Sequence, residues 1–314
     1  MESLLSYILT IIITAVYALV PFSGGSGAID KANIRMRAAV VSDTHIDYRL
    51  PIGQAVLAGA CAEMNLLKPD VFVDLGDLTN YGDAKSMEKH FKITDKFLDK
   101  DIDEIYLTGN HDIGHSEMSN EDARLNFVSV YNQYIDYKID KTWFSHDVNG
   151  YTFIVMGTED EDNWDSPEYS DSQLSFLDSE LARGSEGGRP VFVCAHVPLA
   201  GIHGEQYYYD GVTEEPYSSA IQSILEKYDN VFFMTGHVHK GLSNSVKTPT
   251  YITVNGVHYL TLPSYLMPNW PQGGLTNHGM AFVIEVYDGE VVLRARNCIT
   301  QKWYKSFEYT EKIA

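Results

Sequence analysis

The stretch EIYLTGNHD, residues 104–112, joins an apolar run to a cluster of polar side chains. The run Glu104–Leu107 has the composition of a strand. It passes through Gly109 directly into Asn110, His111 and Asp112. A tight turn requires the glycine, but it does not require three successive side chains that can bind a metal or transfer a proton. This junction therefore marks a candidate functional site at the end of a strand.

Four other apolar runs end in the same way. Side chains that can bind a metal follow the runs 38–41, 71–75, 190–195 and 231–235: Asp43 and His45, Asp77, His196, and His237 and His239 respectively. Ligand sites in open α/β sheets collect beyond the carboxyl ends of the strands. One such residue at the end of a strand is ordinary, but five strands that end in this way predict a single shared site.

The spacing inside two of these motifs predicts how their side chains point. Asp43 and His45 are two residues apart, and so are His237 and His239. In an extended chain, residues at this spacing project to the same side. Glycines precede three of the candidates, where we expect sharp turns or close approach of the backbone: Gly76, Gly109 and Gly236.

The order of the predicted elements indicates an α/β fold. Helical patterns at 52–67 and 83–100 separate the first three strands, which predicts parallel strands covered by helices. Further helices are expected at 172–183 and 218–228. The second half has more antiparallel character, and Asn149-Gly150 predicts a hairpin. Strands broken by hairpin turns fill residues 250–314, and we expect them to complete the second sheet of one domain spanning 37–314.

Charge and cysteine content exclude some classes of protein. The chain has 314 residues with 23 Lys and Arg against 43 Asp and Glu, which gives a net charge of −20. No basic stripe is available for a nucleic-acid backbone, so we expect no binding of that kind. The three cysteines, Cys61, Cys194 and Cys298, do not form a disulfide framework. A single bridge between Cys61 and Cys298 remains an alternative.

The N-terminus has the features of an export or anchoring segment. Residues 3–29 carry no charge, and the apolar run 7–20 has the length of a signal-peptide core. The small residues 26–28 offer a cleavage site, which predicts a signal peptide at 1–28. An uncleaved membrane anchor at 3–22 is the rival, and a buried helix is a third reading. We expect a secreted or membrane-anchored, extracytoplasmic protein, although the basic residues that follow favour a cytoplasmic location for that side: Lys31, Arg35 and Arg37.

The combined motifs resemble the calcineurin-like metallophosphoesterase superfamily. The resemblance covers about residues 37–240 and implies a two-sheet α/β sandwich flanked by helices, an αββα arrangement, with a dinuclear metal centre. By motif, one metal would be held by Asp43, His45, Asp77 and His239. The other would be held by Asp77, Asn110, His196 and His237. His111 would be a catalytic acid that binds no metal, oriented by Asp112.

Details within the motifs narrow the resemblance. Purple acid phosphatases place a tyrosine ligand three residues after the shared aspartate, where this chain has Asn80, and they lack the histidine found here as His45. The sequences GDLTN and GNHD are closer to the cyclic-nucleotide-phosphodiesterase type. Imidazole, carboxylate and amide ligands suit two divalent or trivalent transition-metal ions such as Mn, Fe or Zn.

The expected reaction is metal-dependent hydrolysis of a small phosphate ester. Arginine is absent between Arg189 and Arg294, and Lys240 and Lys247 are the nearby lysines after His239. A site with few cations beyond its metals favours a singly charged phosphodiester. A phosphomonoesterase, a nucleotide pyrophosphatase and a non-catalytic scaffold are the alternatives. Aromatic residues that would contact the substrate, or else pack or lie exposed, are Trp164, Tyr207, Tyr208, Tyr209 and Trp270.

Overall fold

The computed structural model describes residues 33–114, 118–159, 166–203, 211–267, 269 and 278–313. The predicted export segment and the aromatic residues Trp164, Tyr207–Tyr209 and Trp270 lie outside the described residues. Among the helices in the described ranges, none is both long enough and apolar enough to cross a bilayer.

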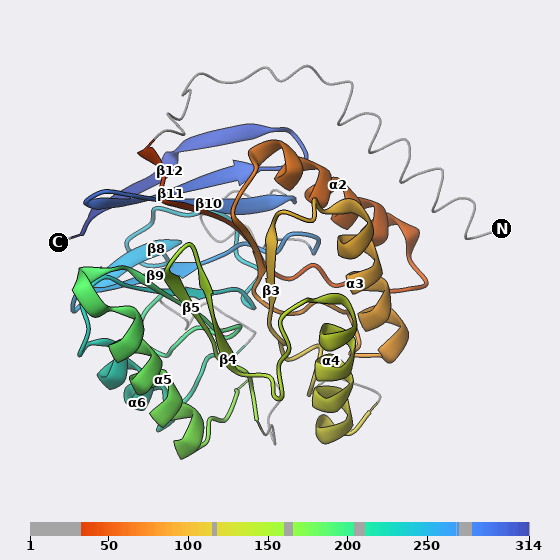
Figure 1. The fold of residues 1–314 in the computed structure, drawn as a ribbon, viewed down its shortest axis with the longest axis horizontal. Helices are drawn as coiled ribbons and strands as arrows, with labels where there is room; N and C mark the ends of the chain where they lie inside the picture. Colours follow the sequence, from red (N-terminus) through yellow and green to blue (C-terminus); the bar gives the residue numbers. More distant parts are fainter. Residues whose placement is uncertain are drawn as a thin grey trace.

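The first half of the chain builds three parallel strands with helices between them, as predicted. Strand β1 pairs with β2, and β2 pairs with β3, in parallel register. The helices of this half gather on one side of the molecule (Figure 1). The elements are β1 (Met36–Val41), α2 (Pro51–Leu67), β2 (Val71–Asp74), α3 (Ala84–Phe97), β3 (Asp103–Tyr106) and α4 (Asn120–Tyr134).

Helix α4 is an element that the sequence analysis did not predict. Its apolar residues Phe127, Val130 and Tyr131 are buried at helical spacing. The side chain of Ser119 accepts a hydrogen bond from the backbone N–H of Asp122 and caps the first turn. Both signals are present in the sequence, and together they would have located the helix.

The second half builds another sheet. Its order is β4-β5-β6-β7-β9-β8, and the strands β5, β6, β7 and β9 are parallel to one another. The predicted hairpin at Asn149-Gly150 joins β4 to β5 in antiparallel register. The elements are β4 (Phe144–Val148), β5 (Tyr151–Val155), α5 (Asp171–Gly184), η2 (Glu186–Gly188), β6 (Val191–Cys194), α6 (Tyr217–Leu225), β7 (Val231–Thr235), β8 (Tyr251–Val254) and β9 (Val257–Thr261).

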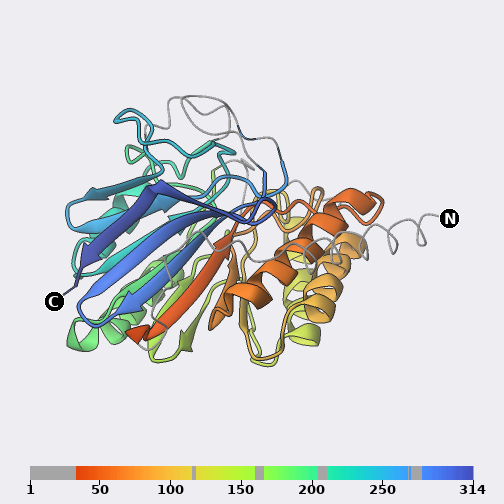
Figure 2. The same ribbon diagram turned by 90° about the horizontal axis from the view of Figure 1, so that it is seen from above.

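The C-terminal strands correct one prediction. Only β8 and β9 join the second sheet, whereas the last strands extend the first one in the order β12-β11-β10-β1-β2-β3. Figure 2 shows these blue strands beside the orange β1. The free edge of β1 accepts β10 in antiparallel register, which a local hairpin pattern does not reveal. These strands are β10 (Met280–Tyr287), β11 (Glu290–Asn297) and β12 (Lys302–Lys312).

The two sheets pack face to face, and the expected αββα sandwich is confirmed. Phe153, Phe192 and Phe232 of the second sheet belong to the cluster that also contains the strands of the first sheet. Their neighbours in the chain, such as Ile154 and Val193, belong instead to the cluster with helices α5 and α6. Strands buried on both faces account for the continuous apolar runs of the sequence. The three cysteines are buried free thiols, so the Cys61–Cys298 bridge is not formed.

Candidate metal centre

The predicted site residues converge between the carboxyl ends of strands from both sheets. Asp43, Asp77 and Asn110 follow β1, β2 and β3, and His196 and His237 follow β6 and β7. The loops are bonded to one another: the Asp43 N–H donates to the carbonyl of Gly76 at 3.0 Å, and the Gly236 N–H donates to the carbonyl of His196 at 2.9 Å. The seven residues predicted as metal ligands therefore occupy one place in the fold.

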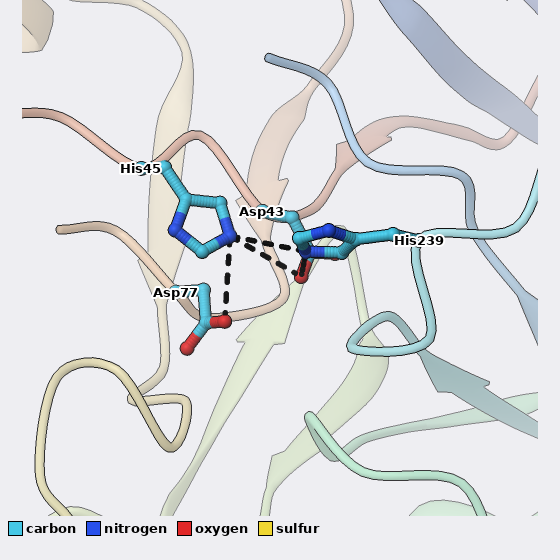
Figure 3. A group of neighbouring side chains, drawn as sticks. All are labelled: Asp43, His45, Asp77 and His239. Carbon is cyan, nitrogen blue, oxygen red and sulfur yellow. Dashed lines mark hydrogen bonds and ion pairs between the residues drawn. The ribbon is translucent and has the colours of Figure 1, made fainter. Parts of the chain in front are cut away.

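The first of two groups is Asp43, His45, Asp77 and His239 (Figure 3). One potential ligand atom from each of these residues lies within 4.8 Å of every other. The Nε2 atom of His45 is 3.1 Å from Nε2 of His239 and 3.5 Å from Oδ2 of Asp77. Oδ1 of Asp43 is 3.1 Å from Nε2 of His239. These four side chains have the composition and the spacing to hold one metal ion.

The second group shares Asp77 with the first. Oδ2 of Asp77 also lies 3.3 Å from Nε2 of His196. Oδ1 of Asn110 is 3.2 Å from that same nitrogen and 3.0 Å from Nδ1 of His237. Meanwhile Oδ1 of Asp77 accepts a hydrogen bond from the backbone N–H of His111 at 2.9 Å, which leaves Oδ2 between the two groups. The two groups of side chains therefore meet at one carboxylate oxygen, Oδ2 of Asp77.

The chemistry of these groups fits transition-metal ions. Nδ1 of His196 lies 2.7 Å from the carbonyl of Leu75, so a neutral ring carries its proton there and turns the Nε2 lone pair into the site. Nε2 of His45 and Nε2 of His239 face each other, and two neutral rings require either a shared proton or a cation between them. A metal ion in the site would accept the Nε2 lone pair of His196, and it would also supply the cation between His45 and His239.

The electrostatics of the buried site favour the metal-binding protonation states of Asp43, His45 and His237, but not that of His196. Burial raises the pKa of Asp43, but His239 and His196 outweigh it and bring the pKa to about 2. Burial lowers the pKa of His45 and of His237 to about 3, so both rings are neutral at neutral pH. Burial also lowers the pKa of His196, but Asp77 outweighs it and raises the pKa to about 10. A metal that binds His196 must displace that proton.

The backbone of the ligand motifs differs from the extended chain assumed from the sequence. Asp43 and His45 have φ values of 58° and 42°, and His237 and His239 have φ values of 69° and 42°. Residues other than glycine rarely adopt this left-handed conformation, and such strain is concentrated at functional sites. Each pair of side chains is therefore brought together by a strained turn rather than by strand pleating.

The glycines ahead of the ligands are required by close contacts, as expected. A Cβ atom on Gly109 would lie 2.2 Å from Oδ1 of Asp77 and 2.7 Å from Nε2 of His196. A Cβ atom on Gly236 would lie 1.8 Å from Oγ of Ser42. Gly76 has a φ of 95°, which disfavours any larger residue.

His111 and Asp112 are both present at the site, but their relationship differs from the prediction. Nδ1 of His111 lies 2.8 Å from the carbonyl oxygen of Asn80, which orients the ring. Asp112 instead accepts hydrogen bonds from the backbone N–H groups of Leu78, Thr79 and Gly109, and from the hydroxyl of Thr79. Asp112 thus ties the loop after β2 to the loop after β3. The orienting role of Asn80 was not predicted, because it depends on a backbone carbonyl and not on a residue type.

A comparison with protein families identifies the chain. The family model described as calcineurin-like phosphoesterase matches residues 36–241. The chain belongs to the calcineurin-like phosphoesterase family. The resemblance inferred from its motifs is therefore confirmed.

Relatives of this calcineurin-like phosphoesterase include one curated protein and several solved structures. This chain is 30% identical over 125 residues to a manganese-dependent ADP-ribose/CDP-alcohol diphosphatase from Arabidopsis thaliana. The match covers 39% of this chain and 34% of that protein. The chain thus spans about a third of the length of this relative.

Solved structures that share the fold include two phosphatases. A dimetal phosphatase from Danio rerio matches with a TM-score of 0.63 and 14% identity, over 90% of this chain and all of that one. A purple acid phosphatase from yellow lupin matches with a TM-score of 0.59 and 17% identity, over 88% of this chain and 53% of that one. At these identities the likeness concerns the fold alone.

Proposed function

We propose that this phosphoesterase hydrolyses phosphodiesters with two transition-metal ions. Asp43, His45, Asp77 and His239 would hold one ion, and Asp77, Asn110, His196 and His237 would hold the other. Bound there, the ions would supply Lewis acidity that polarises the phosphoryl oxygens and activates water. The observation that carries the proposal is the position of Oδ2 of Asp77, 3.5 Å from Nε2 of His45 and 3.3 Å from Nε2 of His196.

The preference for a diester rests on the charges around the site. The ion pairs of Asp43 and Asp77 are with histidines. The ammonium group of Lys240, which follows His239, donates to the carbonyl of Thr248, and burial lowers its pKa to about 8. A monoester dianion requires more positive charge around it than a singly charged diester does. A site whose carboxylates pair with histidines, and not with lysines or arginines, therefore suits the singly charged diester.

His111 would act on the leaving group. A ring whose Nδ1 donates to the Asn80 carbonyl takes a second proton at Nε2. An imidazolium in this position can donate that proton to the departing alkoxide, the ordinary task of a general acid. The backbone N–H of His111 at Oδ1 of Asp77 keeps this residue beside the shared carboxylate.

A second candidate reaction is hydrolysis of a diphosphate that links a nucleoside to a small alcohol or sugar. The Arabidopsis relative, whose name specifies ADP-ribose and CDP-alcohols and a requirement for manganese, favours it. Each phosphorus in such a diphosphate also has two substituents and one ionisable oxygen, so the phosphoryl group that is attacked carries one negative charge, as in a diester, and the second charge lies on the neighbouring phosphorus. The same relative supports manganese as the metal to try first.

The test compares five kinds of substrate at equal manganese loading of the full chain. The kcat/KM for bis-nitrophenyl phosphate is expected to exceed that for nitrophenyl phosphate, and ADP-ribose decides between the two candidates. A clear preference for nitrophenyl phosphate would overturn the proposal and make the protein a phosphomonoesterase. A value for ADP-ribose far above that for cyclic nucleotides and glycerophosphodiesters would select the diphosphatase reaction.

We also propose that the protein works outside the cytoplasm, on the basis of the uncharged N-terminal segment. The protein recovered from an exporting host is expected to begin after Ala28 or close to it, which N-terminal sequencing would reveal. Recovery of intact Met1 in the membrane fraction would indicate the anchor at 3–22 instead. Intact Met1 in a soluble cytosolic fraction would reject both.

A further inference from the structure

A buried polar chain lies directly behind the candidate metal centre. Asp74, the last residue of β2, is fully buried. Its Oδ2 accepts a hydrogen bond from the hydroxyl of Thr44 at 2.9 Å and lies 3.3 Å from Nε2 of His90. His90 belongs to α3 and is also fully buried. None of these three residues is among the candidate ligands.

The Asp74–His90 pair is costly to keep. Its remaining polar atoms, Oδ1 of Asp74 and Nδ1 of His90, are buried without a hydrogen-bond partner in the described part of the chain. A buried carboxylate with one unsatisfied oxygen destabilises a fold, and apolar side chains of similar size are often more stable there. A polar pair retained at such a place calls for an explanation beyond packing.

Thr44 supplies that explanation, because it lies between two candidate ligands. Asp43 and His45 both have left-handed backbone conformations, with φ values of 58° and 42°. Such a turn persists only where surrounding contacts hold it. The backbone N–H groups on either side of Thr44 are already bonded to the loop after β2. The Thr44 hydroxyl adds a side-chain anchor from the middle of the turn to Asp74.

We propose that Asp74 and His90 are positioning residues for the metal centre. They hold Thr44, and through Thr44 they hold the turn that presents Asp43 and His45 to the metal. The inference rests on the metal sites of the proposed function. It adds that part of the affinity for metal is set by residues that do not touch the metal.

The geometry makes this effect selective. Asp43 and His45 belong to the first group of ligands, with His239. Asn110 and His196 of the second group come from other loops, which Asp74 does not anchor through Thr44. Loosening the Thr44 turn is therefore expected to weaken one metal site much more than the other, whereas a general loss of stability would affect both.

The experiment measures binding of Mn²⁺ to the metal-free full chain by calorimetry, with unfolding followed separately. Thr44→Val removes the hydroxyl and keeps the shape, and Thr44→Ser keeps the hydroxyl. The matched control is Thr94→Val, since Thr94 is a buried threonine on α3 whose hydroxyl donates to the carbonyl of Phe91. Should a valine variant not fold, Thr44→Ala against Thr94→Ala makes the same comparison.

We expect Thr44→Val to raise the Kd of one Mn²⁺ ion by about 10–100-fold, the usual effect of losing a contact behind a ligand. Thr44→Ser and Thr94→Val should leave both Kd values near those of the wild type, even if Thr94→Val lowers the Tm. Asp74→Asn, which keeps an acceptor oxygen, should resemble Thr44→Ser more than Thr44→Val.

Two outcomes would overturn the inference and leave the proposed function intact. One is wild-type affinity for both ions in Thr44→Val, and the other is equal weakening of both sites in Thr44→Val and Thr94→Val. If the wild-type chain does not bind two Mn²⁺ ions, the metal sites of the proposed function are wrong and this inference falls with them.

Discussion

At the scale of single residues, the contacts of His111 and Asp77 predict what their substitution does to turnover and to metal content. Nδ1 of His111 faces the carbonyl of Asn80 at 2.8 Å, and its backbone N–H donates to Oδ1 of Asp77 at 2.9 Å. Asp77 thereby has one oxygen held by the backbone and the other shared by two groups of histidines. Their substitutions should have different signatures, because one acts on a proton and the other on the metals.

His111→Ala is expected to leave the metal content near that of the wild type and to lower turnover by about 10²–10⁴-fold, the range for a general acid. The loss should be larger for an alkyl leaving group than for nitrophenolate, which departs without a proton. Metal analysis and kcat for both kinds of diester test this, with His146→Ala as a control on β4. Equal losses for both leaving groups would remove the case for an acid.

Asp77→Asn is expected to lower the metal content at both positions and to abolish activity. The reason is that Oδ2 of Asp77 lies beside His45 and His196, which belong to different groups. Metal analysis after dialysis measures the effect, and Asp178→Asn on α5 serves as the control. A variant that retains two metals per chain and full turnover would contradict the bridging role.

At the scale of elements, the site depends on how closely the loops after the strands approach one another. The loop after β3 packs against the loop after β2 so tightly that Gly109 has no space for a side chain. Asp112 reinforces this contact through the backbone N–H groups of Leu78 and Thr79. The loops after β2 and β3 thus act as one rigid unit, in which a small displacement moves Asp77 and Asn110 together.

Gly109→Ala should therefore remove bound metal and lower kcat/KM by about 10²-fold or more, since even small misplacement of reacting groups has such effects. The contacts of 2.2 Å and 2.7 Å to Asp77 and His196 force the ligands apart. Gly256→Ala is the control, because its Cβ meets nothing within 4 Å although its φ is 85°. That variant should lose some stability and keep its metals. Normal metal content in Gly109→Ala would show that the loops are adaptable.

At the scale of the whole molecule, the two sheets are joined at the site as well as through the core. His196 follows a strand of the second sheet, yet its ring contacts the carbonyl of Leu75 beyond the first sheet. The sheets also share the apolar cluster that contains Phe72 and Phe192. Conditions that loosen the packing of the sheets should for this reason disturb the metal centre too.

Low pH is one such condition. Protonation of His203 accounts for a measurable part of the stability that the folded protein loses in acid. Burial lowers the pKa of His203 from 6.5 to about 4 in the folded protein. The unfolded chain takes up this proton at a higher pH, so stability is complete above about pH 6.5 and is lost as the pH falls toward 4. The loss from this one group is on the order of 3 kcal/mol.

Urea unfolding of the metal-free protein at pH 7.5 and pH 4.5 tests this expectation. His203→Asn, which can still donate to the carbonyl of Pro249, should show a smaller decrease in the free energy of unfolding between the two pH values. An equal decrease in both proteins would mean that other groups account for the acid sensitivity.

The sequence determined which residue types stand at the ends of the strands. Apolar runs that stop at Asp77, Asn110 or His196 are local features, and the parallel arrangement of such strands brings their ends to one edge. The candidate ligand residues follow from that rule, whereas the αββα sandwich was implied by the resemblance to the calcineurin-like superfamily. The requirement for glycine at position 109 could also be predicted, because a glycine before a candidate ligand indicates close approach of the backbone to the site.

Only the tertiary structure decided the contacts between segments far apart in the chain. The edge of β1 took up β10, although a hairpin pattern does not specify its neighbour. The carbonyl of Asn80, rather than Asp112, came to face His111, and Thr44 came to rest on Asp74. The physical reason is that pairing partners and backbone hydrogen bonds depend on which surfaces the folded chain brings together, and neither periodicity nor residue type encodes that proximity.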